Sequence, residues 1–425
     1  MSAKTWHILL LGLLLFTRPV LAAEPPKSGE LLTTVERRAF DYFWREADPA
    51  TGLTKDRAPN REGADGAEPK GPAVASIAAT GYMLAAMPIG VEHHWITSKE
   101  GYDRCLLTLR FVDARLACVH GFYYHFLDAS TGARVWSSEL SSIDSALLAL
   151  GGLTAGEYWP RTEVERLAGE IAGRMDWRWM RTNGGALPDE SAPAMGWNPE
   201  RGFLEARWRG YSEACFLYLL ALGTPEPNGL PASSWDSWTF PTRRVEDFAV
   251  FGGPSPIFMA QMTPGYFDLR GLRDRQGRDW WTAWRSAHRA DQAYCARATQ
   301  SKTYAAGFWA INAFDRPDGY GADRPVDGAN GGTVSPSGMI AGILFTPKRS
   351  EQALADMWAL RDIIWGRYGF CDAFNLDRDW YDPDVIGIDL GMLLLNVENS
   401  RTGLVWRLVR RSPIARRGIA AAGFH

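Results

Sequence analysis

The feature that most constrains the fold of this chain is a regular alternation between two kinds of helix-length segment. One kind carries apolar residues at helical spacing among charged ones, which is typical of a helix with one face in water and one in the core. The other kind is shorter, rich in Ala, Ser, Gly and Leu and nearly free of charge, so it predicts helices that are buried on all sides. The charged segments span residues 30–47, 98–117, 161–180, 279–298 and 348–368, with a weaker one at 233–238. The apolar segments span residues 74–87, 141–150, 211–222, 256–263, 335–345 and 385–397.

This alternation predicts an all-α fold of the (α/α)6 type, a toroid in which the apolar helices form an inner ring and the charged helices an outer ring. Small residues in the apolar set favour the toroid, because helices that crowd around one axis need short side chains where they touch. An irregular helical bundle is the alternative. In a toroid, the loops at one end of the inner helices surround a cleft, and the long Gly- and Pro-rich stretches 55–72 and 311–332 are its expected rims.

Two of the apolar segments open with a carboxylate at a matching position. Glu213 follows Tyr-Ser in YSEACFLYLLALG, and Asp144 follows Ser-Ile in SSIDSALLALGG. A structural role explains each one alone, because Ser212 is suited to cap its helix and the helix dipole favours an acid in the first turn by roughly 0.3–1 kcal/mol. If the inner helices point the same way, however, both acids face one cleft, as cleavage of a glycosidic bond requires. Glu139, just before the second apolar segment, is a third candidate.

The aromatic content of the chain indicates a ligand with flat apolar faces. Aromatic residues make up 12% of the chain and include 19 Trp, more than an ordinary core uses. Sugar rings have apolar CH faces that stack on indole rings, so a cleft lined with Trp suits a carbohydrate. For any single Trp, core packing remains the alternative. The candidates that flank the apolar segments are Trp136, Trp197, Trp208, Tyr211, Phe308 and Trp309.

Polar residues also stand within and just after the apolar segment 256–263. They include Gln261, Asp268 and Arg270. Asp268 and Arg270 are spaced to form a structural ion pair, and a polar girdle that hydrogen-bonds the hydroxyl groups of a sugar would show the same residue types. We expect this group to contribute to substrate binding.

Charge and composition exclude several other classes of protein. The net charge of −3 gives no basic footprint for nucleic acid, and the Arg-rich stretch near residues 407–417 is short. The five cysteines show no metal-binding spacing, the seven histidines are scattered, and the run Glu92–His94 is too local for a zinc site. We therefore expect buried free thiols, no metal and no cofactor.

The first residues predict export from the cytoplasm. A single Lys, an apolar run over residues 8–16 and the small pair Ala22-Ala23 form a secretory signal over residues 1–23, followed by one domain over residues 24–425. The apolar run is too short to span a bilayer. We expect a periplasmic protein without a membrane span.

A series of motifs in this chain matches one family in the same order: FDYFWREADPATGLTKDR, SSIDSALLALGG, YSEACFLYLLALG, YFDLRGLRD, GTVSPSGMIAGILFTP, GFCDAFN and IGIDLGMLLLNVEN. The chain thereby resembles the bacterial glycoamylase-like domain, and especially the endo-β-1,2-glucanases that share it. The resemblance implies an (α/α)6 fold, a β-1,2-glucan substrate and cleavage with inversion. It also implies that the essential Glu of the family is Glu213 and that its second acid is Asp144, whereas Ser141 occupies the position of a further acid.

These observations lead to one main hypothesis for the function and two alternatives. The first is a glycoside hydrolase acting on β-1,2-glucan or a similar periplasmic glucan, with Glu213 as general acid and Asp144 placing or activating water. The second is a transglycosylase that passes the glycosyl unit to a sugar hydroxyl. The third is a glucan-binding protein without activity.

Overall fold

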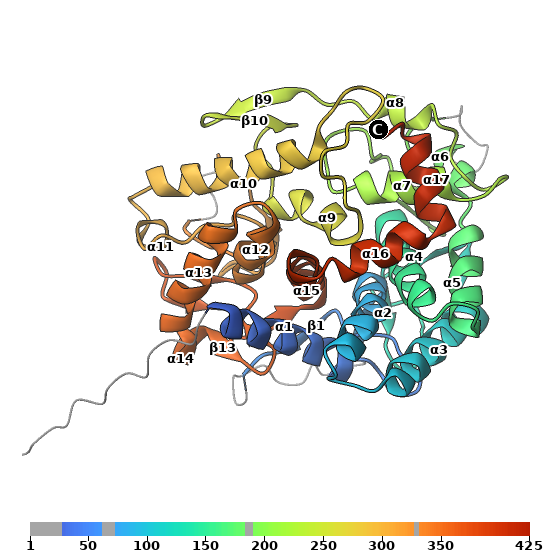
Figure 1. The fold of residues 1–425 in the computed structure, drawn as a ribbon, viewed down its shortest axis with the longest axis horizontal. Coiled ribbons are helices and arrows are strands. Elements are labelled where there is room, and N and C mark those ends of the chain that lie inside the picture. The colour runs from blue at the N-terminus through green and yellow to red at the C-terminus, as the bar shows by residue number, and fades with distance from the viewer. Residues whose placement is uncertain (1–27, 62–72, 183–189, 327–330) are drawn as a thin grey trace, which may run out of the picture.

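The helices formed by the apolar segments occupy the middle of the molecule, and those formed by the charged segments surround them (Figure 1). The structure is a computed structural model that describes residues 28–61, 73–182, 190–326 and 331–425. The inner helices are α2 (Ile77–Glu92), α4 (Ser142–Tyr158), α7 (Cys215–Gly223), α9 (Met262–Tyr266), α12 (Pro336–Ala341) and α15 (Gly387–Arg401). Short 3-10 turns extend two of these segments, η2 (Ile257–Ala260) before α9 and η4 (Gly342–Leu344) after α12.

The outer helices follow the periphery of the ring. In Figure 1, α10, α13, α1, α3 and α5 run around it, and α15 is seen nearly end-on close to the centre. The outer set comprises α1 (Ser28–Arg45), α3 (Ser98–Ala114), α5 (Glu163–Gly173), α6 (Trp177–Thr182), α8 (Ser234–Ser237), α10 (Trp280–Arg297), α11 (Lys302–Ala305), α13 (Pro347–Ala359), α14 (Arg361–Ile364) and α17 (Pro413–Ala421). Helix α16 (Leu404–Arg411) instead crosses the middle of this view and packs on the inner helices α4, α9 and α15. Along the inner set α2 packs on α4, α4 on α7, α7 on α9, and α15 on α9, α12 and α2. This is the predicted (α/α)6 arrangement.

Two of the expected outer helices differ from the prediction. The weak segment near residue 233 forms only the single turn α8, and α17 packs on α7 instead. The segment 161–180 is split into α5 and α6, because the backbone N–H of Trp177 turns away to the carbonyl oxygen of Asn228. Prediction from periodicity did not detect either change, since both depend on contacts with distant parts of the chain.

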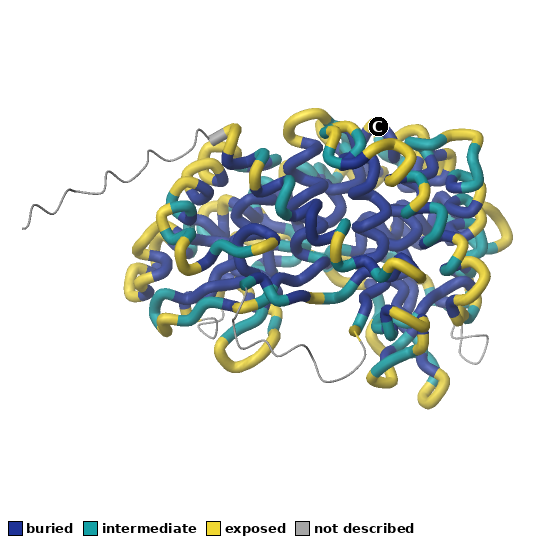
Figure 2. Tube along the Cα trace, turned by 90° about the horizontal axis from the view of Figure 1, so that it is seen from below, coloured by how far each residue is buried: buried dark blue, intermediate teal, exposed yellow. Residues whose placement is uncertain are grey.

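Burial follows the inner and outer division (Figure 2). Every residue of α7 is buried, as are residues 77–90 of α2. Ser76, Ser141 and Ser335 cap α2, α4 and α12, each accepting a hydrogen bond from a backbone N–H in the first turn. The serines that precede the apolar segments therefore begin three inner helices.

Glycines allow two inner helices to touch backbone to backbone. A methyl group added to Gly151 on α4 would lie 1.9 Å from the carbonyl oxygen of Gly81 on α2, and one added to Gly81 would lie 2.4 Å from that of Leu147. No larger residue fits at either position without moving a helix. The small residues of the apolar segments are thus explained by close helix contact.

Short antiparallel strands lie where inner helices begin. Strands β2 (Val74–Ser76), β6 (Leu140–Ser141) and β17 (Asp384–Ile386) lead directly into α2, α4 and α15. They pair with β5 (Phe126–Asp128), β7 (Gly196–Asn198) and β1 (Arg57–Pro59), in registers that place Ser76 opposite Phe126, Ser141 opposite Gly196 and Arg57 opposite Ile386. The pairing holds loops from distant parts of the chain at the N-terminal ends of the inner helices. The remaining strands are β3 (Cys118–Val119), β4 (Phe122–Tyr123), β8 (Gly202–Phe203), β9 (Thr242–Val245), β10 (Phe248–Phe251), β11 (Ala313–Phe314), β12 (Gly321–Ala322), β13 (Trp365–Gly366), β14 (Gly369–Phe370), β15 (Phe374–Asn375) and β16 (Trp380–Tyr381).

Three further sequence predictions bear on the surroundings of the chain. The predicted signal, residues 1–23, lies outside the described residues. None of the helices within the described ranges is long and apolar enough to cross a bilayer. All five cysteines are free, and four of them are buried as expected, whereas Cys118 is exposed.

Candidate active site

A pocket of about 390 Å³ opens at the N-terminal ends of the inner helices. Its apolar wall comes mainly from α4, α9 and α15 and from η2, and the described parts of the two expected rim loops contribute Arg57 and Tyr320. Acidic side chains from three inner-helix starts converge on this pocket. Its lining residues are Asp56, Arg57, Ser76, His125, Phe126, Ile143, Asp144, Leu147, Glu213, Phe258, Met262, Ala313, Tyr320, Ile386, Ile388, Asp389 and Met392.

Glu213 lies two residues before α7, and this differs from the first-turn position expected from the sequence. The reason is that Ser212 does not cap α7. The Thr263 hydroxyl from α9 accepts a hydrogen bond from the Phe216 N–H at 3.1 Å, and Ser212 accepts only from Ala214 at 3.4 Å. The bend at residues 211–213 turns Glu213 into the pocket.

The Glu213 carboxyl group is in an environment that favours its protonated form. Removal from water raises its pKa, a hydrogen bond from its own backbone N–H opposes this, and the nearby charge of Asp144 raises it further, to about 7. A carboxylic acid with this pKa keeps a proton near neutral pH and can donate it.

Asp144 is held on the pocket wall by two neighbours. The Ser141 hydroxyl donates a hydrogen bond to its Oδ2 at 2.5 Å, and His125 Nε2 lies 3.5 Å from the same oxygen. His125 uses its other ring nitrogen to contact Glu139 Oε1 at 3.1 Å. The structure therefore brings Asp144 and Glu139 together through His125, which the sequence analysis did not identify.

The electrostatics of this group favour an imidazolium between two carboxylates. Burial alone would lower the pKa of His125, but the charge of Asp144 and the hydrogen bond to Glu139 raise it to about 9. The same hydrogen bond lowers the pKa of Glu139 against the effect of its partial burial. Asp144 and Glu139 thus face a positive charge at neutral pH.

Asp389, in the first turn of α15, lines the pocket and pairs with Asp372, which lies behind it and outside the pocket lining. Burial and the charge of Asp56 raise its pKa to about 7, although a hydrogen bond with Asp372 opposes this rise. Burial and the charge of Asp389 raise the pKa of Asp372 well above its ordinary value. Of the two carboxyl groups, Asp372 therefore holds its proton more tightly, and Asp389 ionises first, as the pH rises through about 7. The amide of Asn312 lies 3.5 Å from Asp389 Oδ1.

Arg57 supplies positive charge at the rim of the pocket. Its Nη1 atom lies 2.6 Å from Asp315 Oδ2, and its Nε atom lies 3.4 Å from Asp56 Oδ2. The pairing of β1 with β17 brings this arginine close to the start of α15. A guanidinium group here limits the repulsion among the acids.

The predicted aromatic residues separate into exposed and buried sets. Trp136 is 71% exposed, and its ring lies 5.2 Å from that of Phe126, which lines the pocket. Its backbone has a positive φ of 55°, an unfavourable conformation for a bulky residue. Trp197 on β7 is half-buried against Trp179, with ring centroids 5.8 Å apart, and is not part of the pocket lining.

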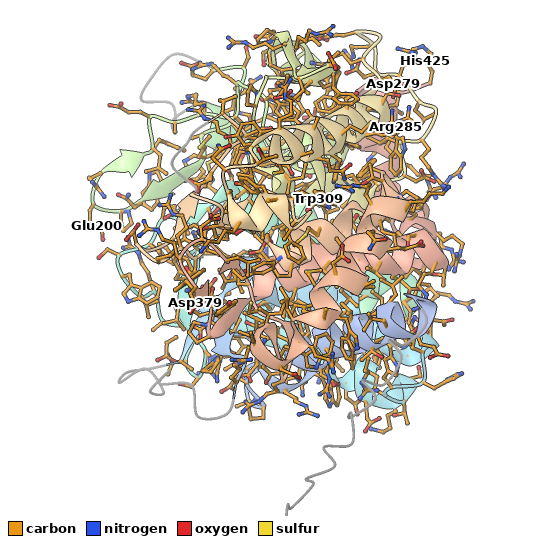
Figure 3. All side chains as sticks on the ribbon, turned by 90° about the vertical axis from the view of Figure 1, so that its left-hand side faces the viewer. Glu200, Asp279, Arg285, Trp309, Asp379 and His425 are labelled. Carbon is orange, nitrogen blue, oxygen red and sulfur yellow. The ribbon has the colours of Figure 1, made fainter. Side chains whose placement is uncertain are left out.

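The other aromatic candidates do not reach the pocket. Trp208 is buried and donates its indole N–H to Ser142 Oγ at 2.9 Å. Trp309 is 1% exposed and lies within the body of the molecule (Figure 3), next to the buried Phe308. Tyr211 lines a neighbouring pocket beside Phe240.

The three predicted polar residues also lie elsewhere. Gln261 is fully buried and donates to the carbonyl oxygen of Gly338 at 2.7 Å, so it links α12 to the turn before α9. Asp268 and Arg270 form a two-pronged ion pair, with both N–O distances 2.7 Å, in a different cavity. This pair therefore has the geometry of a structural ion pair, which was one of the two roles considered for it from the sequence.

Three of the functional residues that sequence reasoning missed had a visible signal. The motif IGIDLGMLLLN repeats the Ile-Asp start of SSIDSALLALGG, and this repetition would have identified Asp389. Tyr320, 57% exposed and in the pocket lining, lies in a stretch that was recognised as a rim. Arg57 likewise lies in the other expected rim, residues 55–72, whereas His125 had no such signal, because the pairing of β5 with β2 brings it to the pocket.

One group of possible metal ligands comes together in the described part of the chain. Oxygen or nitrogen atoms of Glu36, His93 and Glu398 lie within 4.8 Å of one another, and Arg401 already pairs with Glu36. Glu398 lies near the C-terminal end of α15, so this group is remote from the pocket. Its members bind one another and tie α1, α2 and α15 together.

The fold and the site resemble those of glycoamylase-like (α/α)6 domains. A family model described as "Putative glucoamylase" matches residues 205–413, a range that contains both Glu213 and Asp389. The resemblance drawn from the sequence motifs is confirmed by this match.

Several known proteins are similar to this chain over nearly its whole length. A putative glucoamylase from Bacteroides fragilis is 28% identical, with a TM-score of 0.87 over 95% of this chain and 99% of that one. An endo-β-1,2-glucanase from Chitinophaga pinensis, solved with sophorotriose and glucose, is 24% identical, with a TM-score of 0.86 over 94% of this chain and 99% of that one, and shows the shared fold.

A relative from Parabacteroides distasonis carries the name exo-β-1,2-glucooligosaccharide sophorohydrolase (non-reducing end). It is 24% identical to this chain, and the match covers 93% of this chain and 58% of the relative. This chain thus spans a little over half of that protein's length.

Proposed function

We propose that this protein is a glycoside hydrolase that cleaves β-1,2-glucan or a closely similar glucan. The observation that carries the proposal is the convergence of Glu213, Asp144 and Asp389, from the starts of three inner helices, on one pocket. Hydrolysis of a glycosidic bond needs one protonated and one ionised carboxyl group on opposite sides of the bond. The β-1,2-glucan linkage is supported by the names of the relatives from Parabacteroides distasonis and Chitinophaga pinensis.

Glu213 serves as the general acid in this proposal. Its pKa of about 7 keeps it protonated when the substrate binds, and it gives the proton to the leaving glycosidic oxygen. After this transfer, Glu213 is a poorly solvated carboxylate. A proton from solvent then neutralises it and restores the acid. The chemistry needs no metal or cofactor beyond these groups.

Asp389 serves as the base that activates water. Asp372 holds its proton more tightly than Asp389 does, so Asp389, once it has ionised with its pKa of about 7, accepts a proton from a water molecule. Cleavage of this kind, in which water attacks the sugar directly, inverts the anomeric configuration. We assign inversion on this basis. Proton NMR of the reaction identifies the anomer that is released first, and this tests the assignment.

Asp144 binds and orients the sugar beside the acid. The hydrogen bond from Ser141 and the ion pair with His125 fix its carboxylate through Oδ2, and they leave its other oxygen atom, Oδ1, for a ligand. Glu139 contacts the other ring nitrogen of His125, Nδ1, and so keeps the imidazole ring in place. This group completes the pocket wall next to Glu213.

A substrate panel tests the proposal. The protein is incubated with β-1,2-, β-1,3-, β-1,4- and α-linked glucans, with and without an acceptor sugar, and the products are separated by chromatography. We expect products from β-1,2-glucan alone, as free sugars. Longer products that form only with acceptor would instead indicate a transglycosylase, and binding without turnover would indicate a glucan-binding protein.

The activity should fall as pH rises through about 7. The general acid must carry its proton, and Glu213 loses it with a pKa of about 7. The basic limb of kcat/KM against pH for β-1,2-glucan should therefore have its midpoint near pH 7. A rate that stays constant up to pH 9 would contradict the assignment of Glu213.

Trp136 should contribute to sugar binding, and Trp208 should not. Trp136→Ala should raise KM by a factor that corresponds to about 1–3 kcal/mol, the usual effect of losing a stacked aromatic ring in a site. Trp208→Ala is the matched control: it removes a buried ring and a hydrogen bond, and it should lower the free energy of unfolding by about 3–5 kcal/mol. Calorimetric binding and urea unfolding of both variants separate the two roles, and unchanged affinity in Trp136→Ala would remove it from the site.

His125 should make stability decrease with pH. Its pKa is raised from 6.5 to about 9 in the folded protein, so the stabilisation is complete below pH 6.5 and is lost as pH rises through about 9. The loss amounts to at most about 3 kcal/mol. The free energy of unfolding by urea should differ between wild type and His125→Gln at pH 6 more than at pH 10. An equal difference at both pH values would show that His125 is not charged in the native state.

A further inference from the structure

A second cavity, of about 560 Å³, lies at the opposite end of the inner ring from the pocket. Helix α9 begins at Met262 in the pocket lining and ends at Tyr266 in the lining of this cavity. Helix α15 likewise starts near Asp389 and is followed by Thr402, which lines the cavity. At 1.5 Å per residue, the two ends of α15 are about 20 Å apart. The cavity is therefore separate from the proposed active site.

The charges of this cavity are opposite to those of the pocket. Its lining contains Arg270, Arg407, Arg410 and Arg416, and among the described lining residues Asp268 is the single acid. Asp268 is already paired to Arg270 through both of its oxygen atoms. Three arginine charges are left without a carboxylate in the lining.

These three arginines keep donors available for a ligand. Arg407 donates to the carbonyl oxygen of Thr402, and Arg416 donates to that of Arg411 at 2.7 Å. Within the described chain, the guanidinium group of Arg410 makes no hydrogen bond or ion pair. Glu157 on α4 lies near enough for Arg416 to lower its pKa, although burial raises that pKa overall, so one acid faces this group from outside the lining.

Helix α16 arranges apolar and basic residues in one wall. In LVWRLVRR the residues Leu404, Trp406 and Val409 are buried, whereas Arg407 and Arg410, three positions apart, share the exposed side. Trp406 is fixed by a hydrogen bond from its indole N–H to the Pro264 carbonyl oxygen at 2.7 Å. The guanidinium group of Arg270 covers one face of the Trp406 ring, 4.5 Å from its centre.

Apolar side chains complete the cavity beneath the arginines. They are Phe267, Leu272, Val409, Ile419 and Phe424, from the end of α9, the loop after it, α16, α17 and the C-terminal residues. A volume of this size accepts a small organic molecule. Arginine favours phosphate, sulfate and carboxylate groups, because its planar donors match their oxygen atoms.

We propose that this cavity binds a small organic anion with an apolar body. The anionic group lies between Arg407, Arg410 and Arg416, and the apolar part lies against Val409, Ile419 and Phe424. A neutral sugar was the ligand first expected at Asp268 and Arg270. It has no negative charge to pair with the three arginines. The source of the anion is either a free metabolite-sized molecule or the headgroup of an anionic lipid.

Calorimetric titration of the whole protein with octyl phosphate, inorganic phosphate and octyl glucoside tests the chemistry. Octyl phosphate combines both expected features, whereas inorganic phosphate lacks the apolar body and octyl glucoside lacks the charge. We expect octyl phosphate to bind at least about tenfold more tightly than either, and its affinity to fall as salt rises from about 50 to about 500 mM, which shortens the range of electrostatic attraction. Equal affinity for octyl glucoside, or no dependence on salt, would overturn the proposal.

Variants of exposed arginines locate the site. The double variant Arg410→Glu/Arg416→Glu should weaken octyl phosphate binding by about tenfold or more, and Arg289→Glu, an exposed change on α10, should leave it unchanged. Glucan turnover should be normal in both, which shows that they fold. Retained affinity in the double variant would place the anion elsewhere and refute the proposal.

Vesicles distinguish the two sources. If phosphatidylglycerol vesicles bind the wild type but do not bind the double variant, the anion is a lipid headgroup. Phosphatidylcholine vesicles are the neutral control and should bind neither protein. Binding of octyl phosphate without binding of these vesicles would show a free anion. Both results support the anion site, and vesicle binding that the double variant retains would contradict it.

Discussion

Glu213→Gln should lower the rate of β-1,2-glucan hydrolysis by about 10²–10⁴-fold, the usual contribution of a positioned general acid. Glutamine keeps the shape and the hydrogen-bonding capacity of the side chain but cannot donate a proton to the leaving oxygen. Because the carboxyl group is uncharged below pH 7, its replacement removes no buried charge and should leave the fold intact. Steady-state kinetics with glucan and a thermal unfolding curve of the same preparation measure both effects.

The competing explanation for Glu213 is a favourable charge near the start of α7. On that explanation the substitution would change stability by a few tenths of a kcal/mol and leave turnover nearly unaltered. Glu351→Gln, an exposed change on the outer helix α13, provides the matched control and should behave as wild type. Near-normal turnover by Glu213→Gln would move the search for the acid to Asp144 and Glu139.

Asp389→Asn should have the second largest effect, again a loss of about 10²–10⁴-fold in kcat, because an amide cannot accept a proton from water. If Asp389 contacts the water and not the sugar, kcat should decrease while KM changes little. Added azide, a nucleophile that needs no base, should restore part of the rate. Restoration by azide would not occur if Asp389 only supported the fold.

Asp144→Asn provides the comparison that separates the two carboxylates. This side chain binds Ser141 and His125, so its amide variant should raise KM and should not respond to azide. If azide instead rescues Asp144→Asn and not Asp389→Asn, then Asp144 is the base, as the sequence analysis expected. The two variants thus assign the role whichever carboxylate holds it.

The positions of the acids on inner helices could be predicted because they depend on local sequence. Ile-Asp and Ser-Glu at the start of an apolar segment place a carboxylate at a helix end, and the alternation of charged and apolar segments places those ends together. Asp144 and Glu213 indeed line one pocket. The exact start of α7 could not be predicted, because Thr263 from another helix supplies its cap.

The rest of the site depends on contacts that no local pattern reveals. Arg57 reaches the pocket because β1 pairs with β17, more than three hundred residues later in the chain. Trp208 and Trp309 were predicted to meet the substrate from their place next to apolar segments, yet both rings are buried. A Trp beside an apolar segment has the same sequence signature whether it faces the cleft or the core.

The most direct test of the central claim compares two substrates with one variant. Glu213→Gln is assayed on β-1,2-glucooligosaccharide and on a dinitrophenyl β-glycoside of the same sugar, whose leaving group needs no proton. If Glu213 gives its proton to the leaving oxygen, kcat/KM should fall by about 10²–10⁴-fold on the oligosaccharide and remain close to wild type on the aryl glycoside. An equal fall on both substrates would show that Glu213 acts by some other means and would contradict the account.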